Sequence, residues 1–139
     1  MANELILIVE DNEKNRKLVR DVLQHRGYRT LEAETGEDGV RLAREHHPAL
    51  ILMDIQLPGI DGIAALGQLR SDPATRAVPV IAVTASAMTH DRQKIMAAGF
   101  DAYQTKPINL REFLAAVDGA VAGRRLPRPS SSWMTRRRT

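Results

Sequence analysis

The fold is decided by the stretch Leu50-Ile51-Leu52-Met53-Asp54-Ile55-Gln56-Leu57-Pro58-Gly59-Ile60-Asp61-Gly62. Four large apolar residues are followed by a carboxylate and then by a Pro-Gly turn, a pattern typical of a strand that is buried on both faces. A second apolar run, residues 5–9, also ends in acids, Glu10 and Asp11. Because open α/β sheets place their sites at the carboxyl ends of strands, both runs are expected to deliver carboxylates to such a site.

The rest of the chain alternates between helix and strand patterns. Apolar residues at helical spacing predict helices near residues 12–26, 35–48, 61–71, 89–98 and 109–121. Shorter apolar runs predict further strands at residues 28–33, 80–84 and 101–105. Strands that are joined by helical crossovers form parallel sheets with right-handed connections. The sequence therefore predicts a doubly wound α/β domain, a (βα)5 three-layer sandwich around a parallel five-stranded sheet.

Composition limits the class of protein. At 139 residues the chain fits one domain of ordinary size. It has no cysteine, which excludes disulfides and thiolate metal sites. No apolar run approaches the ~20 residues that span a bilayer, and the N-terminus lacks a signal-peptide pattern. We therefore expect a cytoplasmic protein that does not contact membranes.

The positive charge of the chain lies at its C-terminus. Six of the 20 basic residues are arginines that follow Gly123, where there is no acid, so the remaining 14 basic and 17 acidic residues give the rest a formal charge of −3. This distribution does not indicate a nucleic-acid-binding fold. Apolar periodicity also stops at Gly123, which predicts a domain at residues 1–122 and a basic, disordered tail at residues 123–139.

Five polar residues fall at the predicted carboxyl ends of strands: Glu10, Asp11, Asp54, Thr84 and Lys106. Two carboxylates ~4 Å apart repel by roughly 4 kcal/mol at an effective dielectric near 20, so a cation should accompany them. Mg²⁺ suits a pocket of oxygen ligands. An oxygen of Asp54 could then attack a phosphoryl donor in line, while Lys106 neutralises charge and Thr84 hydrogen-bonds to the phosphoryl group. Neither phosphate-binding glycine motif is present, which argues against a nucleotide-bound enzyme.

Each of these residues also has a structural interpretation when it is considered alone. Asp54 could cap a helix or a turn, and Glu10 or Asp11 could cap the helix that follows them. Thr84 could simply end a strand, and Lys106 could be a solvated loop charge. The histidines lie in polar contexts and are interpreted as surface residues: His25, His46, His47 and His90.

Four motifs follow one another along the chain: Val9-Glu10-Asp11-Asn12, the stretch from Met53 to Gly62, Val83-Thr84-Ala85 and Lys106-Pro107. Across residues 4–122 they make the chain similar to the receiver domains of two-component response regulators. The resemblance implies a flavodoxin-like fold with strand order 2-1-3-4-5, and it extends most closely to single-domain DivK-type (CheY-like) regulators and to receivers attached to hybrid kinases.

The resemblance also implies the roles of individual residues. Asp54 would be the phosphoacceptor, and Mg²⁺ would be held by Asp11, Asp54, the Gln56 carbonyl and Glu10. Glu10 departs from the more usual Asp, and its longer side chain would reach the metal through water. The phosphate-sensing switch would consist of Thr84 and Tyr103, with Lys106 as the phosphate-binding lysine. Gln56 and Ser86 would influence the phosphoryl lifetime, and the Lys106-Pro107 peptide would be cis.

The function implied is a single-domain response regulator of a phosphorelay. It would accept a phosphoryl group from a histidine kinase or a histidine phosphotransfer protein, which would dock at the first helix. It would catalyse its own phosphorylation and dephosphorylation without turning over an external substrate. Its output would be a protein contact at the face formed by the fourth helix, fifth strand and fifth helix.

Two alternatives remain open from the sequence. A phosphatase-like hydrolase could use Asp54 as a transient nucleophile, although Gln56 stands where a second acid would be needed. A pseudo-receiver could bind a partner without being phosphorylated, which the departure at Glu10 would permit. Tyr103 could likewise be a half-buried packing residue without a switch role.

Overall fold

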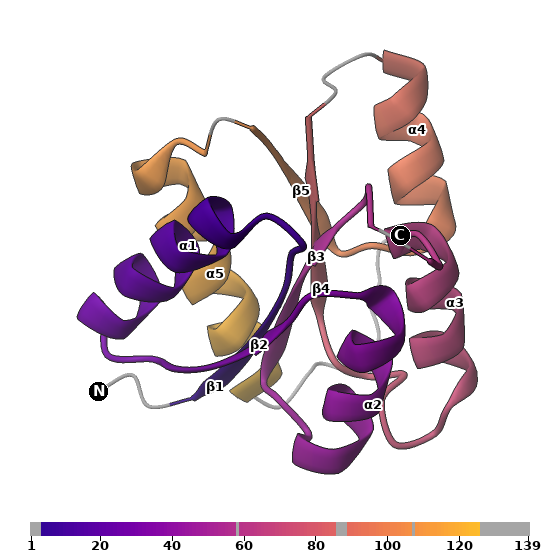
Figure 1. Cartoon of the computed structure of the whole chain (residues 1–139), viewed down its shortest axis with the longest axis horizontal. Coiled ribbons are helices and arrows are strands. Elements are labelled where there is room, and N and C mark those ends of the chain that lie inside the picture. The colour runs from indigo at the N-terminus through magenta and orange to yellow at the C-terminus, as the bar shows by residue number, and fades with distance from the viewer. Residues whose placement is uncertain (1–3, 58, 86–88, 107, 126–139) are drawn as a thin grey trace.

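The computed structural model describes residues 4–57, 59–85, 89–106 and 108–125. Within these ranges five strands alternate with five helices, in the order predicted from the sequence (Figure 1). The elements are β1 (Leu5–Val9), α1 (Glu13–His25), β2 (Arg29–Ala33), α2 (Gly36–His46), β3 (Leu50–Asp54), α3 (Gly62–Ser71), β4 (Val80–Thr84), α4 (Thr89–Ala98), β5 (Ala102–Thr105) and α5 (Leu110–Arg125).

All the strands pair in parallel, in the order β2-β1-β3-β4-β5. This is the flavodoxin-like order that the resemblance implied, and it is confirmed. β1 and β3 are adjacent, with Val9 opposite Met53, and β3 is adjacent to β4, with Asp54 opposite Val83. The carboxyl ends of the three central strands therefore lie side by side at one edge of the sheet.

Helices cover both faces of the sheet, so side chains that alternate along a strand enter two different cores. Figure 1 shows α1 and α5 on one face and α2, α3 and α4 on the other. In β3, Leu50 and Leu52 pack on the α1 and α5 side, whereas Ile51 and Met53 pack on the opposite side. Burial on both faces explains why this strand is a continuous apolar run rather than an alternating one.

Side-chain caps begin the helices where the sequence changes from strand to helix. Asn12, Thr35 and Asp61 each accept a hydrogen bond from the backbone N–H three residues further on. Asn109 accepts one from Glu112 N at 3.1 Å in the same way. These bonds satisfy backbone donors that have no partner within the helix. Asp61 and Asn109 are the residues at which the sequence predicted two of these helices to begin.

The C-terminal helix is longer than predicted. α5 runs to Arg125, past the domain boundary predicted at residue 122. Residues 126–139, most of the predicted tail, lie outside the described residues. In the part of the chain that the structure describes, none of the helices has the length and apolar character needed to cross a bilayer.

Candidate functional site

The site begins with two carboxylates that the central strands carry into a buried position. Asp54 is the last residue of β3, and Glu10 follows the last residue of β1. Only 4% of Asp54 and 6% of Glu10 is exposed, and both line a small pocket with Val19 of α1 and Phe113 of α5. Buried carboxylates are rare unless they are paired or bind a metal, so this position requires a compensating positive charge.

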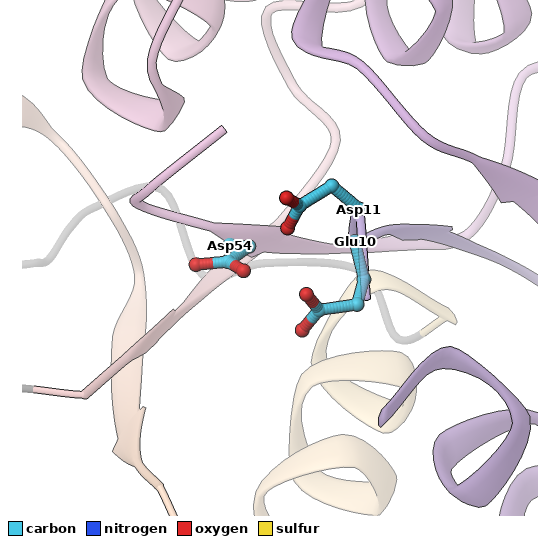
Figure 2. Close-up of side chains that lie close together, drawn as sticks. All are labelled: Glu10, Asp11 and Asp54. Atoms are coloured by element: carbon cyan, nitrogen blue, oxygen red, sulfur yellow. The ribbon is translucent and has the colours of Figure 1, made fainter. Parts of the chain in front are cut away.

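A third carboxylate, Asp11, completes an acidic cluster with these two. One oxygen from each of Glu10, Asp11 and Asp54 lies within 4.8 Å of the others. Figure 2 shows the three side chains facing a common space beside the end of β3. This cluster of residues from two adjacent strand ends is the arrangement that the sequence predicted.

Lys106, which directly follows β5, supplies one positive charge to the cluster. Its Nζ lies 3.0 Å from Glu10 Oε1 and 3.0 Å from Asp54 Oδ2. Burial opposes the charge of this lysine, but its hydrogen bonds to Asp54 and Glu10 outweigh that effect and raise the pKa of Lys106. Lys106 is therefore an ammonium ion that bridges two of the three carboxylates.

One lysine does not neutralise three acids. Burial, followed by the hydrogen bond with Asp54, raises the pKa of Glu10 from its ordinary 4.5 to about 7, even though Asn12 N and Lys106 favour its charged form. The nearby charge of Asp54 also contributes to this shift, and a further cation would offset the repulsion between the acids. Because the available donors are all carboxylate oxygens, the residues present fit a hard divalent ion such as Mg²⁺.

The loop after β3 is held against Asp54 by backbone contacts. Gln56 N donates a hydrogen bond to Asp54 Oδ1 at 3.0 Å, and Gly62 N donates one to Ile55 O at 3.0 Å. A Cβ atom at Gly62 would lie 2.5 Å from Asp54 O, so only glycine allows α3 to begin this close to the strand end. Nothing in the sequence around Gly62 indicates this role.

The remaining predicted site residues lie on β4 and β5. Thr84 ends β4, is 5% exposed, and accepts a hydrogen bond from Lys106 N at its backbone oxygen at 2.8 Å. Tyr103 lies on β5, where its half-buried ring packs against the α2, α3 and α4 side of the sheet. Its hydroxyl accepts a hydrogen bond from Arg92 Nη1 at 2.9 Å. Ser86 and the predicted cis bond before Pro107 lie outside the described residues.

Some contacts around the site were not expected from the sequence. The residues predicted for the site do not include Arg16, which contacts the backbone of Glu10, or Arg92, which contacts Tyr103. Both are charged residues within predicted amphipathic helices, where arginine is common. Their spacing in the sequence therefore does not indicate these contacts. His25, His46 and His47 are exposed, as predicted.

Comparison with known proteins identifies this arrangement. The family model described as the response regulator receiver domain matches residues 6–118. The chain belongs to this family. Phosphorylation of an aspartate is the general function of receiver domains, and they act in two-component regulatory systems.

Individual receiver proteins agree with this assignment. The polar-differentiation response regulator DivK of Brucella ovis is 47% identical over 112 residues, which cover 81% of this chain and 91% of that protein. The receiver domain of a sensor histidine kinase from Pseudomonas aeruginosa PAO1 is 34% identical, with a TM-score of 0.81, and the match covers 86% of this chain and 98% of that one. That structure has a magnesium ion coordinated in its active site cleft.

A more distant structure shows the fold alone. The chemotaxis response regulator CheY4 of Vibrio cholerae is 22% identical, with a TM-score of 0.80 over 85% of this chain and 98% of that one. The receiver fold is therefore retained at a sequence identity too low to carry an argument about residue roles.

Proposed function

We propose that this receiver domain is a phosphorylation switch in which Asp54 accepts the phosphoryl group. The observation that carries the proposal is the position of Asp54: it is a buried carboxylate whose Oδ2 lies 3.0 Å from Lys106 Nζ, within a cluster that contains two further acids. A buried nucleophile beside a fixed cation and a candidate metal site is the arrangement that phosphoryl transfer requires.

The chemistry assigned to the chain is a displacement at phosphorus. An oxygen of Asp54 forms the new bond to phosphorus as the bond to the imidazole nitrogen of a donor phosphohistidine breaks. Lys106 offsets negative charge on the phosphoryl oxygens, and the Thr84 hydroxyl donates a hydrogen bond to the transferred group. The receiver promotes its own phosphorylation by this route. It promotes its own dephosphorylation by hydrolysis, in which a water oxygen attacks phosphorus and the bond to the Asp54 oxygen breaks, with no external substrate turned over.

Asp11, Asp54 and the Gln56 carbonyl would hold a Mg²⁺ ion, with Glu10 acting through water. When bound, the ion would neutralise charge on the phosphoryl oxygens. Glu10 is already held by Lys106 Nζ at 3.0 Å and by Asn12 N at 3.1 Å, which supports an indirect role for its carboxylate. The departure from Asp at this position is therefore compatible with metal binding.

The phosphodonor is assigned to the surface beside α1. A groove between α1 and α5 is lined by three apolar residues, Val22, Leu110 and Leu114, and by three polar ones, Asp21, His25 and Arg26. Leu18 on α1 and Leu110 on α5 are 47% and 45% exposed, respectively, and extend the apolar surface beside these helices. An exposed apolar strip of this kind suits the docking of a helix from a histidine kinase or a phosphotransfer protein.

Direct mapping of the modified residue tests the proposal. The protein is treated with acetyl phosphate and Mg²⁺, and the acyl phosphate is then reduced with borohydride, which converts a phosphorylated aspartate to homoserine. Mass spectrometry is expected to find homoserine in place of Asp54, and EDTA is expected to prevent the conversion. Modification of another residue, or labelling that is unaffected by EDTA, would contradict the assignment.

The output is assigned to the α4, β5 and α5 face, with Tyr103 as the moving part. Arg92 holds the tyrosine hydroxyl at the surface, with its guanidinium 6.0 Å from the ring centroid. If phosphorylation draws Tyr103 inward, this contact must break. The contact therefore favours the unphosphorylated arrangement by an amount typical of exposed cation-aromatic pairs, about 0.5–1 kcal/mol.

Arg92→Ala is accordingly expected to raise the affinity for beryllofluoride, a phosphoryl mimic, by about two- to fivefold. Titration followed through the amide resonances of β4 and β5 measures the change. Lys94→Ala, which removes a neighbouring positive charge from the same helix, serves as the control and is expected to leave the affinity unchanged. Equal effects of the two substitutions would show that the change in beryllofluoride affinity comes from surface charge and not from the contact between Arg92 and Tyr103.

A further inference from the structure

Arg16, near the start of α1, links two parts of the chain that flank the acidic cluster. Its Nη1 donates a hydrogen bond to the backbone oxygen of Glu10 at 2.9 Å, and its Nε donates one to Glu32 Oε1 at 3.0 Å. Only 13% of the Arg16 side chain is exposed. The guanidinium is thus largely enclosed and uses two of its nitrogens on two different acceptors.

Strand β2 holds Glu10 from both sides through this arrangement. Glu10 N donates a hydrogen bond to Ala33 O at 3.0 Å, and Glu32, the preceding residue of β2, anchors the arginine that holds Glu10 O. The two peptide groups that flank the Glu10 Cα are therefore both fixed. A residue with both peptide groups fixed has little freedom in φ and ψ.

The orientation of the next residue depends on this restraint. The Glu10 carbonyl belongs to the same planar peptide group as Asp11 N, so fixing the carbonyl fixes the direction in which Asp11 leaves the strand. Asp11 is exposed, unlike the other two acids, and the apolar cores do not enclose it. Its carboxylate nevertheless lies within 4.8 Å of those of Glu10 and Asp54. The orientation of the backbone can therefore keep the Asp11 carboxylate beside the other two, although its side chain is exposed.

The neighbouring Arg20 shows what an ordinary ion pair at this surface looks like. Arg20 Nη1 lies 3.3 Å from Glu32 Oε2, and 32% of its side chain is exposed. It shares Glu32 with Arg16, and its ion pairs are with carboxylates of α1 and β2, Asp21 and Glu32. The two arginines carry the same charge, lie one helical turn apart and pair with the same acid, but Arg16 also contacts the Glu10 backbone.

We propose that Arg16 is a positioning residue for the divalent cation site, acting through the Glu10 carbonyl to aim the Asp11 carboxylate. This inference rests on the proposed function, because it concerns the site that would hold Mg²⁺. Positioning and charge predict opposite effects. Removing a nearby positive charge by itself should tighten the binding of a cation, whereas losing the hold on Glu10 should weaken it.

Arg16→Met is expected to weaken Mg²⁺ binding by about tenfold, the lower end of the range for residues that orient metal ligands. Arg16→Lys retains the charge but loses the planar fork, so it is expected to bind Mg²⁺ more weakly than the unaltered protein as well. Arg20→Met removes the same charge one turn away, from a more exposed side chain, and is expected not to weaken binding. Mg²⁺ titrations followed through amide resonances give the affinities.

A second measurement needs no metal. Because Asp11 N shares a peptide group with the carbonyl that Arg16 contacts, the ¹⁵N resonance of Asp11 is expected to shift in metal-free Arg16→Met and to stay in place in Arg20→Met. Glu32→Gln leaves Arg16 in the chain but weakens its anchor, and it is expected to change both measurements in the same direction to a smaller extent. This variant tests the restraint even if Arg16→Met folds poorly.

The outcomes separate this inference from the proposed function. If the unaltered protein binds Mg²⁺ and is labelled at Asp54, but the Arg16 and Arg20 variants bind equally well, the positioning role is wrong and the phosphorylation switch stands. Tighter binding by Arg16→Met would show that only its charge matters and would also overturn the inference. An unaltered protein that does not bind Mg²⁺ would overturn both.

Discussion

Asp54→Asn is expected to reduce Mg²⁺-dependent phosphorylation by acetyl phosphate to background. The amide has nearly the same shape as the carboxylate, and its oxygen can still accept the hydrogen bond that Gln56 N donates to Asp54 Oδ1 at 3.0 Å. It has no charge and no oxygen that is nucleophilic enough to attack phosphorus. The substitution therefore removes the chemistry while retaining most of the local structure. The measurement is the amount of labelled phosphate that the protein incorporates with and without EDTA.

A matched control separates loss of the nucleophile from loss of one negative charge. Asp38→Asn makes the same chemical change at an exposed position of α2 and is expected to be labelled normally. Undiminished labelling of Asp54→Asn would remove Asp54 as the phosphoacceptor. Tight partner binding that is indifferent to Asp54→Asn would instead favour the pseudo-receiver, and repeated turnover of small phosphoesters would favour a hydrolase.

Much of this architecture can be predicted because burial leaves a strong trace in sequence. β3 must be apolar on both faces, so Leu50, Ile51, Leu52 and Met53 form an unbroken run, and Asp54 stands out at its end. Parallel strands then bring such ends to one edge without any knowledge of contacts. Helix caps at residues such as Asp61 are also visible, because they act over only three positions.

Contacts between side chains of distant segments are a different matter. Lys106, which follows β5, contacts Glu10 and Asp54, which lie at the ends of β1 and β3. The strand order that makes this contact possible came from the resemblance rather than from periodicity. The hydrogen bond from Arg16 to Glu32 depends on the register of β2 beside β1, which places Glu32 next to Ile8. Helical spacing alone gives no information on such pairings.

The structural role of Gly62 is another feature that the sequence does not predict. Helical and turn patterns both tolerate a glycine at this position, so the sequence does not reveal whether the missing side chain matters. The structure supplies the reason: a Cβ would lie 2.5 Å from Asp54 O and 2.9 Å from Ile55 Cα. These are backbone atoms of the strand end that carries the proposed phosphoacceptor, and they cannot turn away as a flexible side chain can.

Gly62→Ala is therefore expected to lower the free energy of unfolding by about 2–3 kcal/mol, as overpacking of a close contact typically does. The added methyl group must push α3 away from β3 or displace the Asp54-Ile55 peptide, and either movement weakens the hydrogen bond from Gly62 N to Ile55 O. Displacement of Asp54 should slow phosphorylation in the same variant. Urea unfolding followed by circular dichroism, together with acetyl phosphate labelling, measures both effects.

Gly67→Ala provides the control within the same helix. A Cβ at Gly67 would meet nothing within 4 Å, and the residue is exposed on α3. Replacing glycine by alanine in an exposed helix interior is expected to raise the free energy of unfolding by about 0.5–1 kcal/mol. Opposite signs at the two positions would attribute the cost at Gly62 to its approach to Asp54, since helix propensity alone favours alanine at both. If both substitutions stabilised the protein, the close approach of α3 to the end of β3 would be wrong.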